Sequence, residues 1–135
     1  MLGAAQIDVN AALASGLLVL EEGKATPEEL RRWFTSVSAE PSGRPHLIRW
    51  GGDMTWSLQS MPTSAMLMEW ETMCNLMDTP AIFLCQYELT QFAGSVVIDA
   101  LKTHPLCIIG SVTRQNPFYM KPGAFLAELR RRHLR

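Results

Sequence analysis

An acidic residue directly after an apolar run is the first candidate for chemistry in this sequence. The stretch HLIRWGGDMTWSL, residues 46–58, reads as a strand followed by two glycines and then Asp53. In nucleotide-hydrolysing α/β proteins, an acid just past a buried strand holds the magnesium ion beside the phosphates. Asp53 therefore raises two alternatives: an ATPase, or a protein that keeps the shape of one for another purpose.

The loop that would hold the phosphates is missing from the sequence. The pattern G-x-x-x-x-G-K-[ST] does not occur, and neither does G-x-G-x-x-G. In the nearest stretch, SGLLVLEEGKAT, Ala25 follows Lys24 where a hydroxyl would be needed to reach magnesium. A lone carboxylate cannot supply the electrostatics of phosphoryl transfer. We therefore expect no ATP hydrolysis and no nucleotide cofactor.

Other catalytic and metal-binding patterns are also incomplete. The nucleophile elbow G-x-S-x-G is absent. Cys85 and His104 could pair, but nothing local activates the thiol, and a buried core cysteine is the simpler interpretation. The three histidines lack a spacing such as H-x-x-x-H, so we predict no metal site. The sequence predicts a protein that is not an enzyme.

Composition limits the class of protein and of partner. The chain has 135 residues, 47% of them hydrophobic, which fits one globular domain spanning 1–135. The formal net charge of -1 gives no general reason to expect nucleic acid or a membrane as partner. The basic end, LRRRHLR, is expected to be the solvated end of a helix at about 123–135. The three cysteines form no CxxC pair, and no signal peptide is evident, so a cytoplasmic location is expected.

The elements that would position these residues alternate between helices and strands. Helices are expected at residues 8–16, 25–39, 63–77 and 91–103, and strands at 17–20, 46–50, 81–87 and 106–112. Met66, Trp70, Met73 and Met77 recur on one helical face. Residues 81–87 suit a strand buried on both sides. This order predicts an α/β fold: an open, mostly parallel sheet of about four strands with helices on both faces.

Such a sheet binds ligands at the carboxyl ends of its strands. Asp53, the segment 86–88 and Gly110 would lie at that edge. Trp50, Trp56 and Trp70 could line an apolar pocket there, although tryptophan and methionine are also ordinary core residues.

The second half of the sequence closely resembles the MEDS family, the methanogen/methylotroph sensory domains. That family shows CxYD, THP, NPFY and G-E-M-x-W motifs, and this chain matches them at residues 85–88, 103–105, 116–119 and 52–56. Trp70-Glu71 corresponds to a family YE pair. The resemblance covers roughly residues 7–129. Asp53 and Glu88 each exchange one acid for the other, and Trp70 replaces a tyrosine.

The resemblance implies a degenerate RecA-like sheet that has lost its ATPase machinery. Such domains are thought to sense small organic molecules, including hydrocarbon derivatives, in bacterial and archaeal signal transduction and transcription control. Asp53 would then be a relic of the magnesium-binding acid. Family members carry about 50 more residues before the region matched here, with a strand that is central in the sheet. We therefore expect a homodimer or a regulatory protein partner to cover the open edge.

The ligand site expected from this resemblance lies at the strand ends. Aromatic side chains would provide apolar area, while Asp53, His104 and Asn116 would orient the ligand. The full set of expected ligand-binding residues is Trp50, Asp53, Trp56, Tyr87, His104, Asn116, Phe118 and Tyr119. The alternative is an interaction or dimerisation module without a pocket, in which THP and NPFY only shape turns.

Overall fold

The structure is a computed structural model that describes residues 8–22, 26–38, 47–78 and 80–133. Its elements are α1 (Val9–Ala14), α2 (Pro27–Ser38), β1 (Ile48–Asp53), the 3-10 helix η2 (Met54–Trp56), α3 (Ser57–Ser60), α4 (Ser64–Cys74), β2 (Ala81–Gln86), α5 (Gly94–Thr103), β3 (Leu106–Ile109), β4 (Val112–Gln115) and α6 (Pro122–His133). The mixture of helices and strands agrees with the predicted α/β class. None of the described helices has the length and apolar character needed to cross a membrane.

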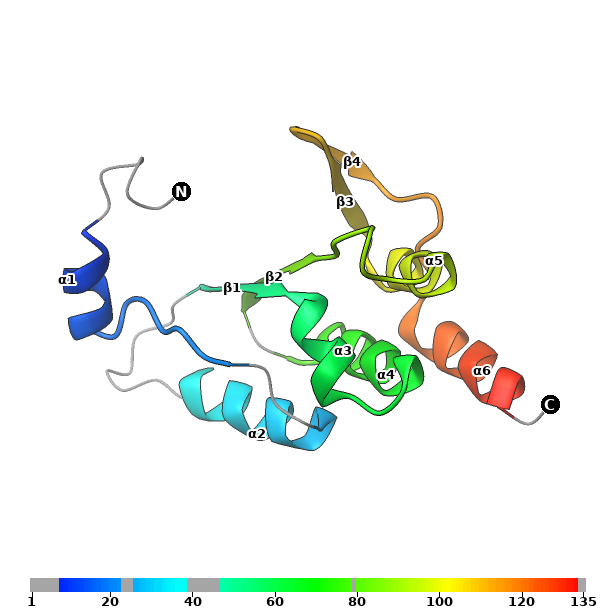
Figure 1. Cartoon of the computed structure of the whole chain (residues 1–135), viewed down its shortest axis with the longest axis horizontal. Coiled ribbons are helices and arrows are strands. Elements are labelled where there is room, and N and C mark those ends of the chain that lie inside the picture. The colour runs from blue at the N-terminus through cyan, green and yellow to red at the C-terminus, as the bar shows by residue number, and fades with distance from the viewer. Residues whose placement is uncertain (1–7, 23–25, 39–46, 79, 134–135) are drawn as a thin grey trace.

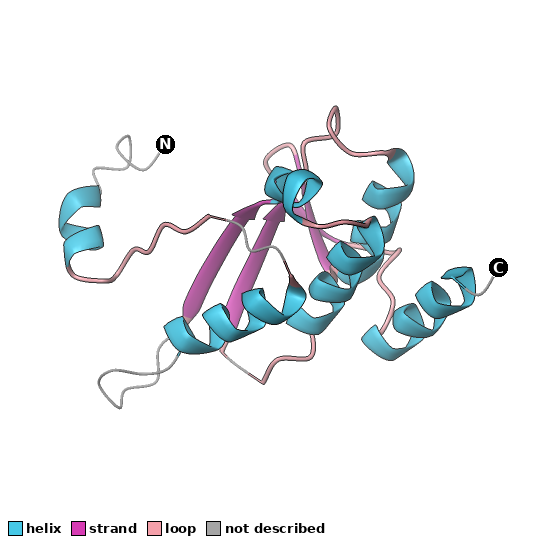
Figure 2. Cartoon of the chain, turned by 60° about the horizontal axis from the view of Figure 1, so that its bottom comes forward, coloured by secondary structure: helices cyan, strands magenta, loops and turns pink. Residues whose placement is uncertain are grey.

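Two parallel strands form the centre of the fold (Figure 2). β1 and β2 pair from Ile48 opposite Ala81 to Asp53 opposite Gln86, and α4 lies on the connection between them. A parallel pair requires such a crossover connection. The predicted strand at 46–50 therefore extends to Asp53, which closes β1 at the carboxyl edge of the pair.

Helices cover one face of this pair and not the other. Residues of β1 and β2 that face α2 and α4 are partly buried, whereas alternate residues are exposed: Arg49, Gly51, Asp53, Ile82, Leu84 and Gln86. Ile82 and Leu84 retain 53% and 43% of their accessible surface. In Figure 1, α2 and α4 lie on the same side of the strands. The predictions of helices on both faces, and of a β2 buried on both sides, are therefore wrong for the described residues.

The core lies between the covered face and the helices. Phe34 of α2 packs on Phe83 of β2 with ring centroids 5.1 Å apart, and Trp50 of β1 meets Trp70 of α4 edge to face at 6.3 Å. α4 is buried around most of its circumference, since Leu67, Met68, Trp70, Glu71, Thr72 and Cys74 are all buried. Of the predicted apolar face only Trp70 is fully buried, and Met66, Met73 and Met77 are partly buried. α4 also contacts α2, α5 and α6, which bury residues on its other sides.

The four predicted strands do not join into one sheet. Residues 106–112, predicted as one buried strand, instead form most of an antiparallel hairpin of β3 and β4. Gly110 adopts a φ of 62° in the two-residue turn, which Gly-Ser favours. The hairpin projects from the body of the fold, and Ile108 and Ile109 are 55% and 68% exposed (Figure 1). Within the described residues neither β3 nor β4 pairs with β1 or β2.

The predicted strand at 17–20 is also wrong. α1 ends before Gly16, as predicted, and Gly16 itself has a φ of 74°. Residues 17–20, however, follow as coil, and Leu17 is 88% exposed. A strand needs a hydrogen-bonded neighbour, and no ladder is described for this segment. The next helix begins where expected: Thr26 and Glu29 form a reciprocal capping box, with the Glu29 amide donating to Thr26 Oγ1 at 3.2 Å and the Thr26 amide donating to Glu29 Oε2 at 3.1 Å.

Candidate functional site

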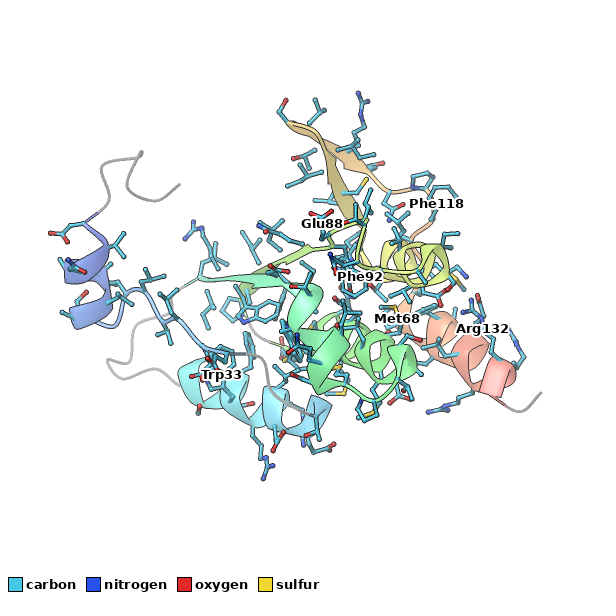
Figure 3. All side chains as sticks on the ribbon, in the orientation of Figure 1. Trp33, Met68, Glu88, Phe92, Phe118 and Arg132 are labelled. Atoms are coloured by element: carbon cyan, nitrogen blue, oxygen red, sulfur yellow. The ribbon has the colours of Figure 1, made fainter. Side chains whose placement is uncertain are left out.

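A large cavity lies at the carboxyl end of β1. It has a volume of about 890 Å³, and we call it the Trp50 cavity. The end of β1, the turn η2, α3 and the extended segment 18–22 form its walls. Trp33 of α2 fixes the outer wall, because its indole Nε1 donates a hydrogen bond to Glu21 Oε2 at 3.2 Å. Figure 3 labels Trp33 on α2.

Gly52, the second of the two glycines before Asp53, makes room for the Trp50 ring. A Cβ atom at Gly52 would lie 2.8 Å from Trp50 Cη2 and 3.3 Å from the Met54 sulfur. A Cβ at Gly51, in contrast, would meet nothing within 4 Å. Trp50 packs against Phe83 at 5.6 Å, so its ring cannot move away freely. Gly52 is therefore needed for the position of Trp50 in the cavity wall.

Asp53 presents an ionised carboxylate at the edge of this cavity. Its Oδ1 accepts hydrogen bonds from the Thr55 amide at 3.0 Å and the Thr55 hydroxyl at 2.8 Å, and so caps η2. These two donors hold the pKa of Asp53 below its usual value. The predicted acid at the strand end is therefore present, but its described contacts are those of a helix cap.

A second group of polar side chains lies between the sheet and the helices, where one member is buried and the others are partly buried. We call Glu71, Cys85, Tyr87 and His104 the Glu71 cluster. Glu71 of α4 is only 1% exposed. Its Oε1 accepts from the Tyr87 hydroxyl at 2.6 Å, and its Oε2 accepts from the Cys85 thiol at 3.4 Å. His104 Nε2 lies 3.4 Å from the same Oε2.

Strand geometry explains how two members of the cluster meet. Cys85 lies in β2 and Tyr87 follows two residues later, so both side chains leave the chain on the same, covered side. His104 is the C-cap residue of α5, and its Nδ1 contacts the Ala100 carbonyl at 2.7 Å. Two separate segments, the end of β2 and the end of α5, thus bring their side chains to one buried carboxylate on α4.

The cluster is not set up for nucleophilic catalysis. Burial, followed by the negative charge of Glu71, raises the pKa of the Cys85 thiol far above its usual value. The same two causes raise the pKa of the Tyr87 hydroxyl. Both groups are therefore protonated donors at neutral pH, and the thiol donates to Glu71 rather than to His104. A cysteine nucleophile would need the opposite shift.

A smaller cavity of about 330 Å³ borders the Glu71 cluster. We call it the His104 cavity, since Glu71 and His104 both contribute to its wall. The rest of its lining is mainly apolar and includes Met77, Phe83 and Leu106. Among the described residues, the Trp50 cavity and the His104 cavity thus both have polar groups at their walls, and they share no lining residue.

The structure distributes the eight predicted ligand residues over three places. Trp50, Asp53 and Trp56 line the Trp50 cavity, while Tyr87 and His104 belong to the Glu71 cluster. The remaining three, Asn116, Phe118 and Tyr119, line neither cavity. These three residues are separated from the Trp50 cavity because β3 pairs with β4 in a hairpin and does not join the parallel pair. The chain after the hairpin therefore does not return to the end of β1. Their part in ligand binding stays a prediction.

Three of the four residues of the NPFY motif were predicted to bind the ligand, and their surroundings differ. Asn116 is 7% exposed, and its side chain bonds to backbone groups. Phe118 is 61% exposed, and it lies on the outer side of the fold in Figure 3. Tyr119 is half-buried, and its amide donates to the Asn116 carbonyl at 3.3 Å. The described contacts make this segment a structured turn.

Sequence reasoning missed the centre of the Glu71 cluster. Glu71 entered only as part of the Trp70-Glu71 pair in the family resemblance, and no metal spacing connects it with Cys85 or His104. The available signal was Glu71, one of two acids within the largely apolar stretch MLMEWETMC, on a helix expected to have an apolar face. A buried acid needs hydrogen-bond partners, so its position on that helix predicts a polar cluster.

Comparison with known proteins identifies one family. The family model described as MEDS, "MEthanogen/methylotroph, DcmR Sensory domain", matches residues 1–105. The matched region includes both strands of the parallel pair and every member of the Glu71 cluster. Searches of curated proteins and of solved structures returned no significant match.

Proposed function

The chain belongs to the MEDS family of sensory domains, and from this membership we propose that it is a non-enzymatic module that binds a small organic molecule. The module would pass the signal of ligand binding to the rest of a cytoplasmic protein that acts in signal transduction or transcription control. We also propose that the β1–β2 pair is what remains of a RecA-like sheet, with Asp53 at the strand end that carries the magnesium ligand in nucleotide hydrolases.

The Trp50 cavity is the observation that carries this proposal. Its volume of about 890 Å³ falls within the range of roughly 300–1,000 Å³ that is typical of small-molecule sites. Trp50 and Trp56 offer ring surface to an apolar ligand, and apolar area dominates the affinity of such sites. A molecule with a short hydrocarbon part would gain most from these walls.

Charge restricts the polar part of the ligand. Three acids, Asp53, Glu21 and Glu22, line the cavity with one cation, Arg49, among the lining residues, and the pKa of Asp53 is lowered. An ionised carboxylate accepts hydrogen bonds and repels other anions. We therefore propose that alcohols and amines bind beside Asp53, and that carboxylates of the same chain length bind less well.

The test is a thermal-shift and calorimetry panel of short alcohols, amines, haloalkanes and carboxylic acids on the purified chain. A ligand present at about 100 times its Kd should stabilise the protein by about 2.7 kcal/mol and raise Tm. Asp53→Asn keeps an oxygen that can cap η2 but removes the charge. It should weaken the binding of amines by about tenfold or more, which corresponds to about 1.4 kcal/mol.

The matched control is Glu88→Gln. Glu88 also accepts hydrogen bonds from a threonine two residues on, with its Oε1 2.9 Å from Thr90 Oγ1, but it lines neither cavity. Its variant should bind the panel as the unmodified chain does. The proposal fails if no compound shifts Tm at millimolar concentration, or if the two variants lose affinity equally.

A second candidate function is a dimerisation module, and the open face of the β1–β2 pair favours it. Ile82 and Leu84 are exposed side by side on this face, next to backbone edges that pair with nothing in the described residues. Exposed strand edges and apolar sheet faces are usually covered in soluble proteins. We propose that a second copy of the chain covers this face.

Light scattering after size exclusion should then report about twice the chain mass of 15.1 kDa at micromolar concentration. Leu84→Glu should give the monomer, because it places a charge in the buried interface. Leu76→Glu serves as control, since Leu76 is 61% exposed and lies in the turn after α4, outside both strands. A monomer for the unmodified chain would contradict the proposal.

A further inference from the structure

Three potential metal ligands converge in the Glu71 cluster. One oxygen of Glu71, the Cys85 sulfur and a ring nitrogen of His104 all lie within 4.8 Å of one another. Glu71 Oε2 is already 3.4 Å from both of the other two atoms. Tetrahedral zinc, with bonds of about 2.0–2.3 Å, holds its ligand atoms about 3.3–3.7 Å apart. Only the Cys85 and His104 atoms need to approach further.

The hydrogen bonds of His104 fix which of its nitrogens is available. Nδ1 lies 2.7 Å from the Ala100 carbonyl, which has only lone pairs, so Nδ1 must carry a proton. In the neutral ring, Nε2 then presents its lone pair toward Glu71 Oε2 at 3.4 Å. Two lone pairs facing each other in a buried site repel, unless a cation lies between them or Nε2 also carries a proton. A backbone carbonyl on Nδ1 is the usual arrangement behind a metal-binding Nε2.

Glu71 has a fixed orientation as well. Its other oxygen, Oε1, accepts from the Tyr87 hydroxyl at 2.6 Å, which leaves Oε2 directed at Cys85 and His104. An outer hydrogen bond of this kind orients a ligating carboxylate. Two of the three ligands are therefore held in place by neighbours that would not themselves bind the ion.

We propose that Glu71, Cys85 and His104 bind a divalent metal ion of the zinc class. Mixed sulfur, nitrogen and oxygen ligands suit zinc, whereas calcium and magnesium prefer oxygen alone. The Cys85 thiol loses its proton to solvent as the metal–sulfur bond forms, and His104 coordinates through the Nε2 lone pair. The proposal does not depend on ligand binding in the Trp50 cavity, since it uses different residues.

The His104 cavity borders the proposed site and could supply its fourth coordination position. Glu71 and His104 are both part of its wall, and about 330 Å³ lies beyond them. A zinc ion with three protein ligands keeps one position for water or another small donor. The site can therefore accept a small molecule with an oxygen, nitrogen or sulfur donor.

The test uses the untagged full chain, stripped with a chelator and titrated with Co²⁺ and then Zn²⁺. We expect one Co²⁺ per chain, a near-ultraviolet band from thiolate-to-cobalt charge transfer, and loss of that band when Zn²⁺ replaces Co²⁺. Zn²⁺ should also raise Tm in the absence of any organic ligand. These readings on the unmodified chain require no variant to fold.

Variants then assign the site. Cys85→Ser should remove the charge-transfer band. Loss of a residue that only hydrogen-bonds to a metal ligand typically weakens metal binding by roughly 10–100-fold. Cys85→Ser and His104→Ala each remove a ligand and should weaken Zn²⁺ binding by more than that. Tyr87→Phe should weaken it within that range. Cys107→Ser, in β3 and outside the cluster, should change nothing. The proposal is overturned if the folded chain takes up no metal, or if uptake survives both Cys85→Ser and His104→Ala.

Discussion

Glu71→Ala is expected to destabilise the fold by about 1–3 kcal/mol, the usual cost of leaving a buried hydrogen-bonding group without its partner. Glu71 is 1% exposed and accepts hydrogen bonds from both Cys85 and Tyr87. Alanine would leave the Tyr87 hydroxyl without its acceptor in a buried position and would open a cavity in α4. The measurement is urea unfolding followed by circular dichroism, with chelator present so that bound metal does not contribute.

Glu71→Gln separates the hydrogen bonds from the charge. Its amide oxygen can still accept from Tyr87, and its amide nitrogen can donate to the Nε2 lone pair of His104. We expect this variant to lose about 1 kcal/mol or less, because the Tyr87 hydroxyl keeps its acceptor and only the weak thiol donor of Cys85 loses one. An alanine variant that unfolds at the same urea concentration as the unmodified chain would show that the cluster does not stabilise the fold.

The contrast between α2 and the hairpin shows how much of the fold could be predicted from the sequence. The start of α2 depends on residues close together in the chain, since Thr26 and Glu29 cap each other. Such signals appear in the sequence, and α2 begins where they indicate. The helices α1, α4, α5 and α6 were likewise found near their predicted positions.

Strand pairing depends on residues far apart in the chain, and here the predictions failed. Residues 106–112 have the apolar composition of a buried parallel strand, but the turn at Gly110 sends the chain back in a hairpin. The apolar run alone does not distinguish these outcomes, because its partner strand is not encoded locally. The same reason accounts for residues 17–20, which lie in coil.

The candidate sites divide in the same way. Asp53 was found because a strand end followed by an acid is a local pattern, and the Trp50 cavity does lie there. The Glu71 cluster joins residues that lie far apart in the chain, on or next to α4, β2 and α5. Glu71 is 14 positions from Cys85 and 16 from Tyr87, and His104 lies further along still. Only the packing of α4 against the sheet brings them together, and no single-sequence motif describes it.

Asn116→Ala is expected to cost about 3 kcal/mol, because it removes three side-chain hydrogen bonds that are each worth roughly 1 kcal/mol. Asn116 Nδ2 donates to the carbonyls of Leu101 and His104 at 2.5 and 2.8 Å. Its Oδ1 accepts from the Phe118 amide at 3.0 Å. The side chain therefore ties the end of α5 to the loop after β4, and alanine would leave the carbonyls at the end of α5 without these donors.

Phe118→Ala is the control, and it decides between two roles for this segment. Phe118 is 61% exposed, so its truncation should change the free energy of unfolding by about 0.5 kcal/mol or less. If the segment instead serves as a ligand surface, both variants should unfold like the unmodified chain and lose affinity for the organic ligand. A structural role also predicts a second result, because the Asn116 side chain donates to the backbone carbonyl of His104. Asn116→Ala should weaken Zn²⁺ binding at the Glu71 cluster, and Phe118→Ala should not.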